Sequence, residues 1–371
     1  MVRRLCWMMI ILVLVFVAVP VRAQSPAQAT RAVDWLRTQQ DASGGFAGFG
    51  ISSTADALYA LAAANVNVDE VMVGGKNAQA FIAANIAEIA AKPGVAAKYV
   101  IAELLTGHSP RNVAGTDLVA VVSQSYNAQT GVYGADVTTH ALALLALVAA
   151  GEPLPSKALD SVVAWQLDDG SWSFTGDRTP LGGDTNTTAL VLQALVAAGQ
   201  ASNPAVPKAL AYLETQQNAD GGFPYSQAST FGTASDANST ALVIQAIVAT
   251  GGAPTSAPWA DANGNPVAAL LGLQNENGAF RYDAATPDDN AFATYQAIPA
   301  LLYMPFPLES IVIIQPAPAA PVAPTAQPAA PTPNVPGQLP NTGGHNIPAW
   351  PFGVIAFGLL LLGMHIRRRA I

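Results

Sequence analysis

Acidic side chains recur at one position of a repeated pattern, where they could bind a ligand or transfer a proton. Aligning the repeats on the glycines that end their second helices places three aspartates at one equivalent position: Asp136, Asp184 and Asp236. Four residues later stands a second equivalent set: His140, Thr188 and Thr240. A further acidic pair, Asp288 and Asp289, precedes Asn290 ahead of the last predicted helix. Carboxylates serve as general acids when their surroundings tune the pKa.

These residues give two sets of candidates. Asp288 and Asp289 are the candidates for a catalytic role. The candidates for ligand binding, grouped at the predicted starts of inner helices, are Asp136, His140, Asp184, Asp236 and Asn290. The simpler interpretation is structural, because aspartate is favoured as a helix N-cap by ~1 kcal/mol over alanine. A single histidine predicts no metal site, and the residues themselves indicate no cofactor.

The helices that would position these side chains come from a repeat. Residues 165–199 combine a helix end, a tight Asp-Gly turn with an aromatic behind it, a polar loop and a helix over 187–198; residues 212–251 repeat the arrangement. Looser copies start near residues 29, 79, 116 and 265, with second helices expected over 54–64, 95–106, 139–150 and 290–302. The second helices of the first five copies stop at Asn65, Gly107, Gly151, Gly199 and Gly251, an interval typical of two-helix repeats.

The composition of the two helices in each repeat predicts the fold class. The second helices are apolar all round (ALVLQALVAAG, ALALLALVAAG), which is typical of buried helices, whereas the first are amphipathic. An open solenoid would expose these apolar helices to water, which costs roughly 25 cal/mol for each Å² of apolar surface. The sequence therefore predicts an all-α (α/α)6 toroid of six helix pairs. It would be followed by a Pro/Ala-rich linker and a C-terminal transmembrane helix.

The N-terminus predicts secretion. Arg3 and Arg4 precede an apolar run, and small residues precede a cleavage site after Ala23, so residues 1–23 are interpreted as a signal peptide. An uncleaved membrane anchor is the alternative. The only cysteine, Cys6, lies in this segment, which removes disulfides and thiolate chemistry from the mature chain. The net charge of −8 argues against nucleic acid as a partner.

The C-terminal part changes composition after the predicted toroid of residues 24–310. Residues 311–338 are rich in proline and alanine, which predicts an extended stalk. Residues 339–371 hold the pentapeptide Leu339, Pro340, Asn341, Thr342 and Gly343, an apolar run and three arginines. Counted from Ile347, the run is long enough to span a membrane, and the arginines would stay on the cytoplasmic side.

The turn sequence QLDDGSW at residues 166–172 resembles the repeat shared by terpene cyclases, protein prenyltransferases and their toroid relatives. Residues 217–223 (QNADGGF) follow the same pattern, and residues 274–280 and 40–46 are looser matches. The resemblance covers about residues 29–303 and implies the toroid. Because this superfamily includes cobalamin carriers, a cobalamin-like ligand is implied by the resemblance alone. The acidic DxDD motif of the squalene-type cyclases is absent, as are the zinc-binding cysteine of the prenyltransferases and the reactive cysteine of the thioester relatives.

The C-terminus resembles a cell-wall sorting signal, in which a sortase-type transpeptidase cleaves between Thr342 and Gly343. A plain membrane anchor is the alternative, and both place the toroid outside the cell, attached to the wall or membrane. The absent motifs favour a non-catalytic toroid that binds a small-molecule or protein ligand. The alternative is an extracellular enzyme, of terpenoid-cyclase-like or polysaccharide-lyase type, that uses the aspartates at the barrel mouth.

Overall fold

The computed structural model describes residues 25–179, 182–230 and 232–307. The predicted signal peptide, the stalk, the sorting signal and the C-terminal apolar run lie outside these residues. Within the described part, no helix is both long and apolar enough to cross a membrane.

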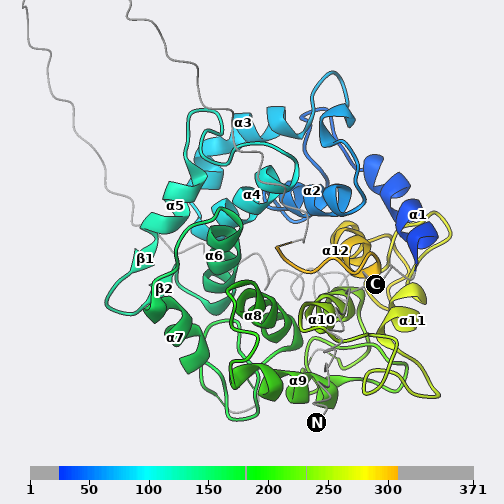
Figure 1. Ribbon diagram of the computed structural model, residues 1–371. Coiled ribbons are helices and arrows are strands. Elements are labelled where there is room, and N and C mark those ends of the chain that lie inside the picture. The colour runs from blue at the N-terminus through cyan, green and yellow to red at the C-terminus, as the bar shows by residue number, and fades with distance from the viewer. Residues whose placement is uncertain (1–24, 180–181, 231, 308–371) are drawn as a thin grey trace, which may run out of the picture.

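Six helices form a closed inner ring, and each contacts the next around the circle until the last contacts the first. In chain order they are α2 (Ser53–Ala63), α4 (Pro93–Leu105), α6 (Val137–Ala149), α8 (Thr185–Ala197), α10 (Ala237–Ala249) and α12 (Ala291–Leu301). Figure 1 shows this ring viewed along its axis. The contact between α12 and α2 closes it, which confirms the predicted toroid of helix pairs.

Six further helices lie outside the ring (Figure 1). They are α1 (Pro26–Arg37), α3 (Ala78–Ala90), α5 (Leu118–Gln124), α7 (Ser156–Ala164), α9 (Ala205–Gln216) and α11 (Pro266–Leu271). Most pack on the inner helix that precedes them in the chain, and α1 packs on α12. A 3-10 turn, η1 (Val68–Glu70), and a two-stranded hairpin, β1 (Tyr126–Asn127) with β2 (Val132–Tyr133), occupy the connections.

The inner helices end as their sequences predict. Asn65, Gly107, Gly151, Gly199 and Gly251 all have positive φ, and Tyr303 takes the same conformation after α12. At each stop the next backbone N–H donates to a carbonyl of the last helical turn, as Gln200 does to Leu195 at 2.8 Å. This is the Schellman arrangement, which satisfies carbonyls that the helix leaves free.

The helix starts differ from the predictions by about two residues. The helix expected over 187–198 begins at Thr185, because Asp184 is the N-cap and the helix starts directly after it. The helix expected over 95–106 begins two residues earlier, with Pro93 as the first residue of α4. Proline is accepted there because the first turn of a helix has no use for its backbone N–H. The helix α12 likewise runs through Pro299 rather than being interrupted by it.

The repeated turn joins one repeat to the next. The side-chain amide of Gln166 donates to Gly170 O in its own turn and to Ala205 O at the start of α9, at 2.9 and 2.8 Å. Gln40 and Gln217 make the corresponding pairs of bonds, and Gln274 donates to Gln28 O in α1. The predicted structural role of the turn glutamines is thereby confirmed, and Gln274 extends it across the point where the ring closes.

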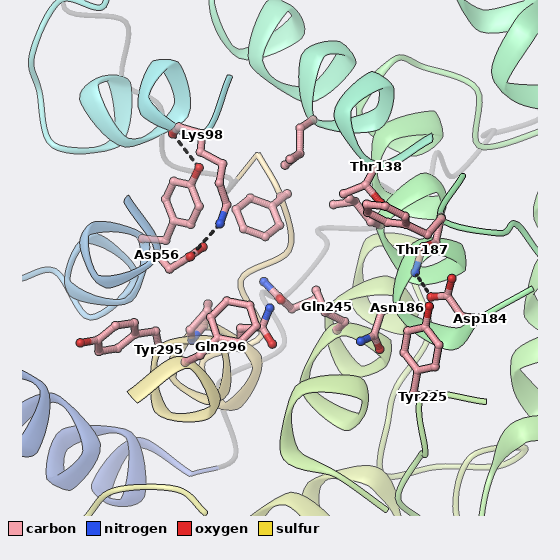
Figure 2. Close-up of a pocket in the computed structure, with 18 residues that line it drawn as sticks. Asp56, Lys98, Thr138, Asp184, Asn186, Thr187, Tyr225, Gln245, Tyr295 and Gln296 are labelled. Atoms are coloured by element: carbon pink, nitrogen blue, oxygen red, sulfur yellow. Dashed lines mark hydrogen bonds and ion pairs between the residues drawn. The ribbon is translucent and has the colours of Figure 1, made fainter. Parts of the chain in front are cut away.

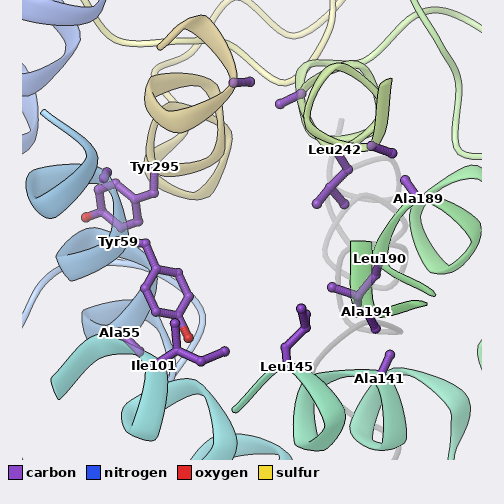
Figure 3. Close-up of a cluster of buried hydrophobic side chains, with 14 of the residues drawn as sticks. Ala55, Tyr59, Ile101, Ala141, Leu145, Ala189, Leu190, Ala194, Leu242 and Tyr295 are labelled. Carbon is purple, nitrogen blue, oxygen red and sulfur yellow. The ribbon is translucent and has the colours of Figure 1, made fainter. Parts of the chain in front are cut away.

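The N-termini of the inner helices lie at one end of the barrel. The first backbone N–H of α6, α8 and α10 donates to a loop carbonyl of the following repeat: Val137 to Phe174, Thr185 to Tyr225 and Ala237 to Tyr282, at 2.8–3.0 Å. Each bond ties the N-terminus of one inner helix to the loop that precedes the next inner helix. The opposite end of the barrel therefore holds the C-termini. The core between the helices consists mainly of alanine, leucine, isoleucine and valine, with buried aromatic residues among them (Figure 3).

Candidate functional site

A cavity lies on the axis of the inner ring. One position of the repeat contributes a lining residue from all six inner helices, and we call this set the first ring: Asp56, Lys98, Leu142, Leu190, Leu242 and Gln296. The empty space is about 760 Å³, including solvent at its open end. The loops and first turns at the N-terminal end of the helices form that opening, where Tyr225 is 39% exposed.

One side of the first ring is polar. The ammonium group of Lys98 lies 2.7 Å from Asp56 Oδ2 and 6.0 Å from the centre of the Phe292 ring (Figure 2). Burial raises the pKa of Asp56, and the charge of Lys98 opposes that rise. Gln296 accepts a hydrogen bond of 2.7 Å from Asn238 through its side-chain oxygen. The polar wall thus comes from α12, α2 and α4.

The other side of the first ring is apolar. It consists of the leucines on α6, α8 and α10, and Figure 3 shows Leu190 and Leu242 projecting toward the axis. At the level of the first ring the cavity therefore presents a hydrogen-bonding wall opposite a hydrocarbon wall, while Asp184, Asn186 and Thr187 add polar groups at the start of α8. This division suits an amphiphilic ligand, since each wall stabilises a different part of such a molecule.

Six aromatic side chains also line the cavity: Tyr59, Phe174, Tyr225, Phe292, Tyr295 and Phe306. They are scattered along the chain, and only Phe292 and Tyr295 share a helix. Two of the tyrosine hydroxyls are held by backbone carbonyls, Tyr59 by Lys98 O at 2.6 Å and Tyr295 by Ala47 O at 2.9 Å. Their rings are thus held in place in the wall.

Asp184 is the one ligand-binding candidate from the sequence that lines the cavity. It caps α8, with Oδ1 accepting the backbone N–H of Thr187 at 2.7 Å. The residue is only 1% exposed. Burial raises its pKa to about 6, against the lowering effect of hydrogen bonds from Thr187 and Tyr225. The cavity thus contains a carboxyl group that exchanges its proton near neutral pH.

The other capping residues lie outside the cavity lining. Asp136 and Asp236 each accept a backbone N–H through Oδ1 and a hydroxyl through Oδ2, from Thr139 and Ser239 respectively. Asn290 accepts the backbone N–H of Ala293 at 2.9 Å. Burial raises the pKa of Asp236 to about 7. The capping interpretation of the sequence therefore accounts for the contacts of these three residues.

His140 is fully buried, and both of its ring nitrogens have partners within the fold. Nδ1 accepts the backbone N–H of Tyr133 at 3.0 Å, so Nε2 carries the proton and donates to Ala158 O at 2.9 Å. Burial lowers the pKa of the ring. Thr188 and Thr240 make the contact that Nδ1 of His140 makes. Each hydroxyl oxygen accepts a backbone N–H, from Trp172 and Phe223 respectively. His140, Thr188 and Thr240 therefore hold the aromatic residues of the turns in place, and they do not line the cavity.

The acidic pair before α12 also lies outside the cavity lining. Asp288 and Asp289 are exposed, and Asp289 accepts hydrogen bonds from Asn275 and Asn277 at 2.8 and 2.6 Å. These contacts hold the loop before α12 to the turn of its own repeat. The structure does not bring the pair together with Asp184. Among the described residues, no three histidine, cysteine or acidic side chains are placed to share a metal ion.

Two glutamines of the inner helices bind the chain that follows α12. Gln193 and Gln245 occupy one equivalent position on α8 and α10 and bind the chain after α12. Gln193 Oε1 accepts the backbone N–H of Phe306 at 2.9 Å, and Gln245 Nε2 donates to Met304 O at 2.8 Å. The lining glutamine of α12, Gln296, is not equivalent to this pair: it belongs to the first ring, one helical turn nearer the mouth.

The cavity offers no axial ligand for a corrinoid. None of the described residues that line it is a histidine or a cysteine. The cobalamin-like ligand implied by the resemblance would therefore have no histidine or cysteine donor to its metal there.

Comparison with known proteins agrees with this architecture. The family pattern of the squalene-hopene cyclase C-terminal domain matches residues 121–287. That range contains Asp184 and the apolar wall of the cavity, but not Asp56, Lys98 or Gln296. No curated protein matches the sequence.

Three solved structures with the same fold are similar over about three quarters of the chain. A protein from Actinoplanes is 14% identical, covers 76% of this chain and 99% of its own, and has a TM-score of 0.55. The type II terpene cyclase MstE from Scytonema is 15% identical, with coverage of 74% and 97% and a TM-score of 0.52. Unsaturated glucuronyl hydrolase from Bacillus sp. GL1 is 14% identical, with coverage of 76% and 95% and a TM-score of 0.52. Together these similarities show that the chain has the α/α-toroid fold.

Proposed function

We propose that this protein binds a small amphiphilic ligand in the axial cavity of its toroid, without catalysing a reaction on it. The observation that carries the proposal is the first ring, in which three polar residues face three leucines across one cavity. A molecule with an apolar body and one hydrogen-bonding end would place its body against Leu142, Leu190 and Leu242. Its polar end would then face Lys98, Asp56 and Gln296.

The proposal is tested by native mass spectrometry of the full-length protein purified from cells in detergent. The expected result is a retained small molecule that is lost from Leu190→Trp, whose indole would fill the cavity. Met72→Trp is the matched control, because Met72 is 57% exposed and does not line the cavity. A clean apo mass, together with no binding of added amphiphiles, would contradict the proposal. A captured protein partner would then indicate adhesion through the outer surface.

The proposed setting of this activity is the cell surface. The order of signal peptide, toroid, Pro/Ala-rich stalk and LPNTG segment supports an extracellular domain attached through its C-terminus, with a sortase-type transpeptidase as the partner. Cell fractionation of wild type and Thr342→Ala tests it. Wall-linked wild type and a membrane-retained variant are expected. The same fractionation for both proteins would favour a plain membrane anchor.

A second candidate function is acid chemistry on the bound ligand. It is favoured by Asp184, which is buried, lines an aromatic cavity and has a pKa of about 6. A protonated carboxyl could donate to an alkene or a glycosidic oxygen, as in a terpenoid-cyclase-like or polysaccharide-lyase type of enzyme. Turnover of a linear polyprenol or a uronate-containing polysaccharide that is lost in Asp184→Asn would establish it. Asparagine keeps the helix cap, so a loss would not reflect unfolding.

A further inference from the structure

A second ring of residues lies one helical turn below the first. Side chains three residues apart share one face of a helix. The second ring therefore consists of Tyr59, Ile101, Leu145, Gln193, Gln245 and Pro299, each three residues after a member of the first ring. Four of these are apolar or aromatic, and the two glutamines are adjacent on α8 and α10. Both glutamines are at most 1% exposed in helices that are otherwise almost entirely apolar.

A buried amide in such helices requires a partner, because an unpaired buried polar group costs roughly 1–3 kcal/mol. The two glutamines find theirs in the chain that follows α12. One accepts the N–H of Phe306 and the other donates to the carbonyl of Met304, so together they bind the backbone of a short peptide segment. Tyr303 begins this segment in the left-handed conformation, with φ of +55°, which turns the chain away from the helix.

The side chain of Phe306 lies against the second ring. Its ring centre is 5.1 Å from that of Tyr59, with the rings nearly perpendicular, and Phe306 lines the cavity. The axial space thus passes from the mouth through the first ring and meets an aromatic side chain at the second. In Figure 1 the segment after α12 runs across the centre of the ring.

We propose that Gln193 and Gln245 form an intramolecular peptide-binding site for the segment 303–307, and that Phe306 sets how far an apolar ligand chain can enter the cavity. The inference rests on the proposed binding function and names its substrate class as linear amphiphiles of limited chain length. Ligand affinity should rise with each added methylene until the chain reaches Phe306. Longer chains then gain nothing.

The test uses 1-alkanols of increasing length, added to the full-length protein and followed by titration calorimetry. For wild type we expect affinity to increase about fourfold per methylene, from ~0.8 kcal/mol for each buried CH₂, up to a limiting length. Phe306→Ala should move that limit to longer alcohols by at least two methylenes. Phe49→Ala is the control, since Phe49 is 47% exposed and does not line the cavity. An unchanged limit in Phe306→Ala would overturn the inference.

A second measurement does not depend on any ligand. Hydrogen exchange of the peptide containing Phe306 should be slow in wild type and at least tenfold faster in Gln193→Leu, which removes the acceptor of the Phe306 amide. Rapid exchange already in wild type would show that the glutamines do not hold the segment, and would overturn the inference. If no alkanol binds to wild type but exchange is slow, the proposed binding function fails while the peptide-binding site stands.

Discussion

Asp56 and Lys98 occupy equivalent positions in neighbouring repeats and form an ion pair of 2.7 Å inside the barrel. The same position carries leucine in the next three repeats and glutamine in the last. Where α2 and α4 meet, the two copies of this position thus carry opposite charges instead of apolar side chains. The pair creates the polar wall of the cavity without leaving a net charge there.

Removing one partner of this pair should be more damaging than removing both. Lys98→Met would leave the carboxylate of Asp56 buried without its cation, and we expect a loss of about 3 kcal/mol in the free energy of unfolding. The double variant Asp56→Leu/Lys98→Leu repeats the composition of the apolar wall and should recover most of that loss. Urea denaturation of the three proteins measures both values. A double variant as unstable as Lys98→Met would contradict this account.

The free energy of unfolding should fall as the pH rises from 4 to 8, and Asp236 should contribute to the fall. Its folded pKa of about 7 exceeds the unfolded value of 3.8, so its protonated form favours the folded state. This stability is fully present below about pH 3.8 and is lost as the pH rises through 7. Asp236→Asn keeps the cap and should reduce the fall by about 2–4 kcal/mol.

The comparison of wild type with Asp236→Asn isolates this one carboxyl. Asp184 and Asp56 have raised pKa values and act in the same direction, whereas buried His140 acts in the opposite direction below about pH 6.5. All three are present in both proteins and cancel in the difference. Parallel stability curves for the two proteins would show that Asp236 is not protonated in the folded state.

Ring closure can be tested at the turn glutamines. Gln274→Leu removes the bonds to Gly278 O and to Gln28 O in α1, and also the exposed bond that Arg31 donates to Gln274 Oε1, so about 1–3 kcal/mol of stability should be lost. Gln166→Leu removes the same two contacts within the middle of the chain. Chemical denaturation should give similar losses for the two variants. A neutral effect of Gln274→Leu alone would indicate that α1 does not dock against the sixth repeat.

Two glycines with left-handed backbone should respond differently to alanine. Gly170 has φ of +92°, and a Cβ there would lie 2.3 Å from Lys208 O in the next repeat. Gly199 has φ of +74°, with nothing within 4 Å of the added carbon. Gly199→Ala should therefore cost only about 1–2 kcal/mol of conformational strain. Gly170→Ala must also separate two repeats, and its Tm should fall well below that of Gly199→Ala.

The sequence by itself determined the repeat, the two kinds of helix and the points at which the helices end. These are local properties: the left-handed stops at Gly107 and Gly199 and the Asp184 cap follow from the residues at those positions. An apolar inner helix also requires burial on every side, so six of them predict a closed ring. The exact starts of the helices depend on the adjoining turns, which decide whether a residue such as Pro93 breaks the chain or begins a helix.

Only the tertiary structure decided which of these side chains share a site. Asp56, Lys98 and Gln296 are distant in sequence and become neighbours because α12 packs against α2 and α2 against α4. The partner of Gln245 is a carbonyl beyond the last helix, which no repeat pattern could indicate. The recurring aspartates are the candidates that the sequence indicated. In the structure each of them caps an inner helix in the same way, whether or not it lines the cavity. The function of the cavity depends on the positions where the repeats differ, and ring closure brings those positions together.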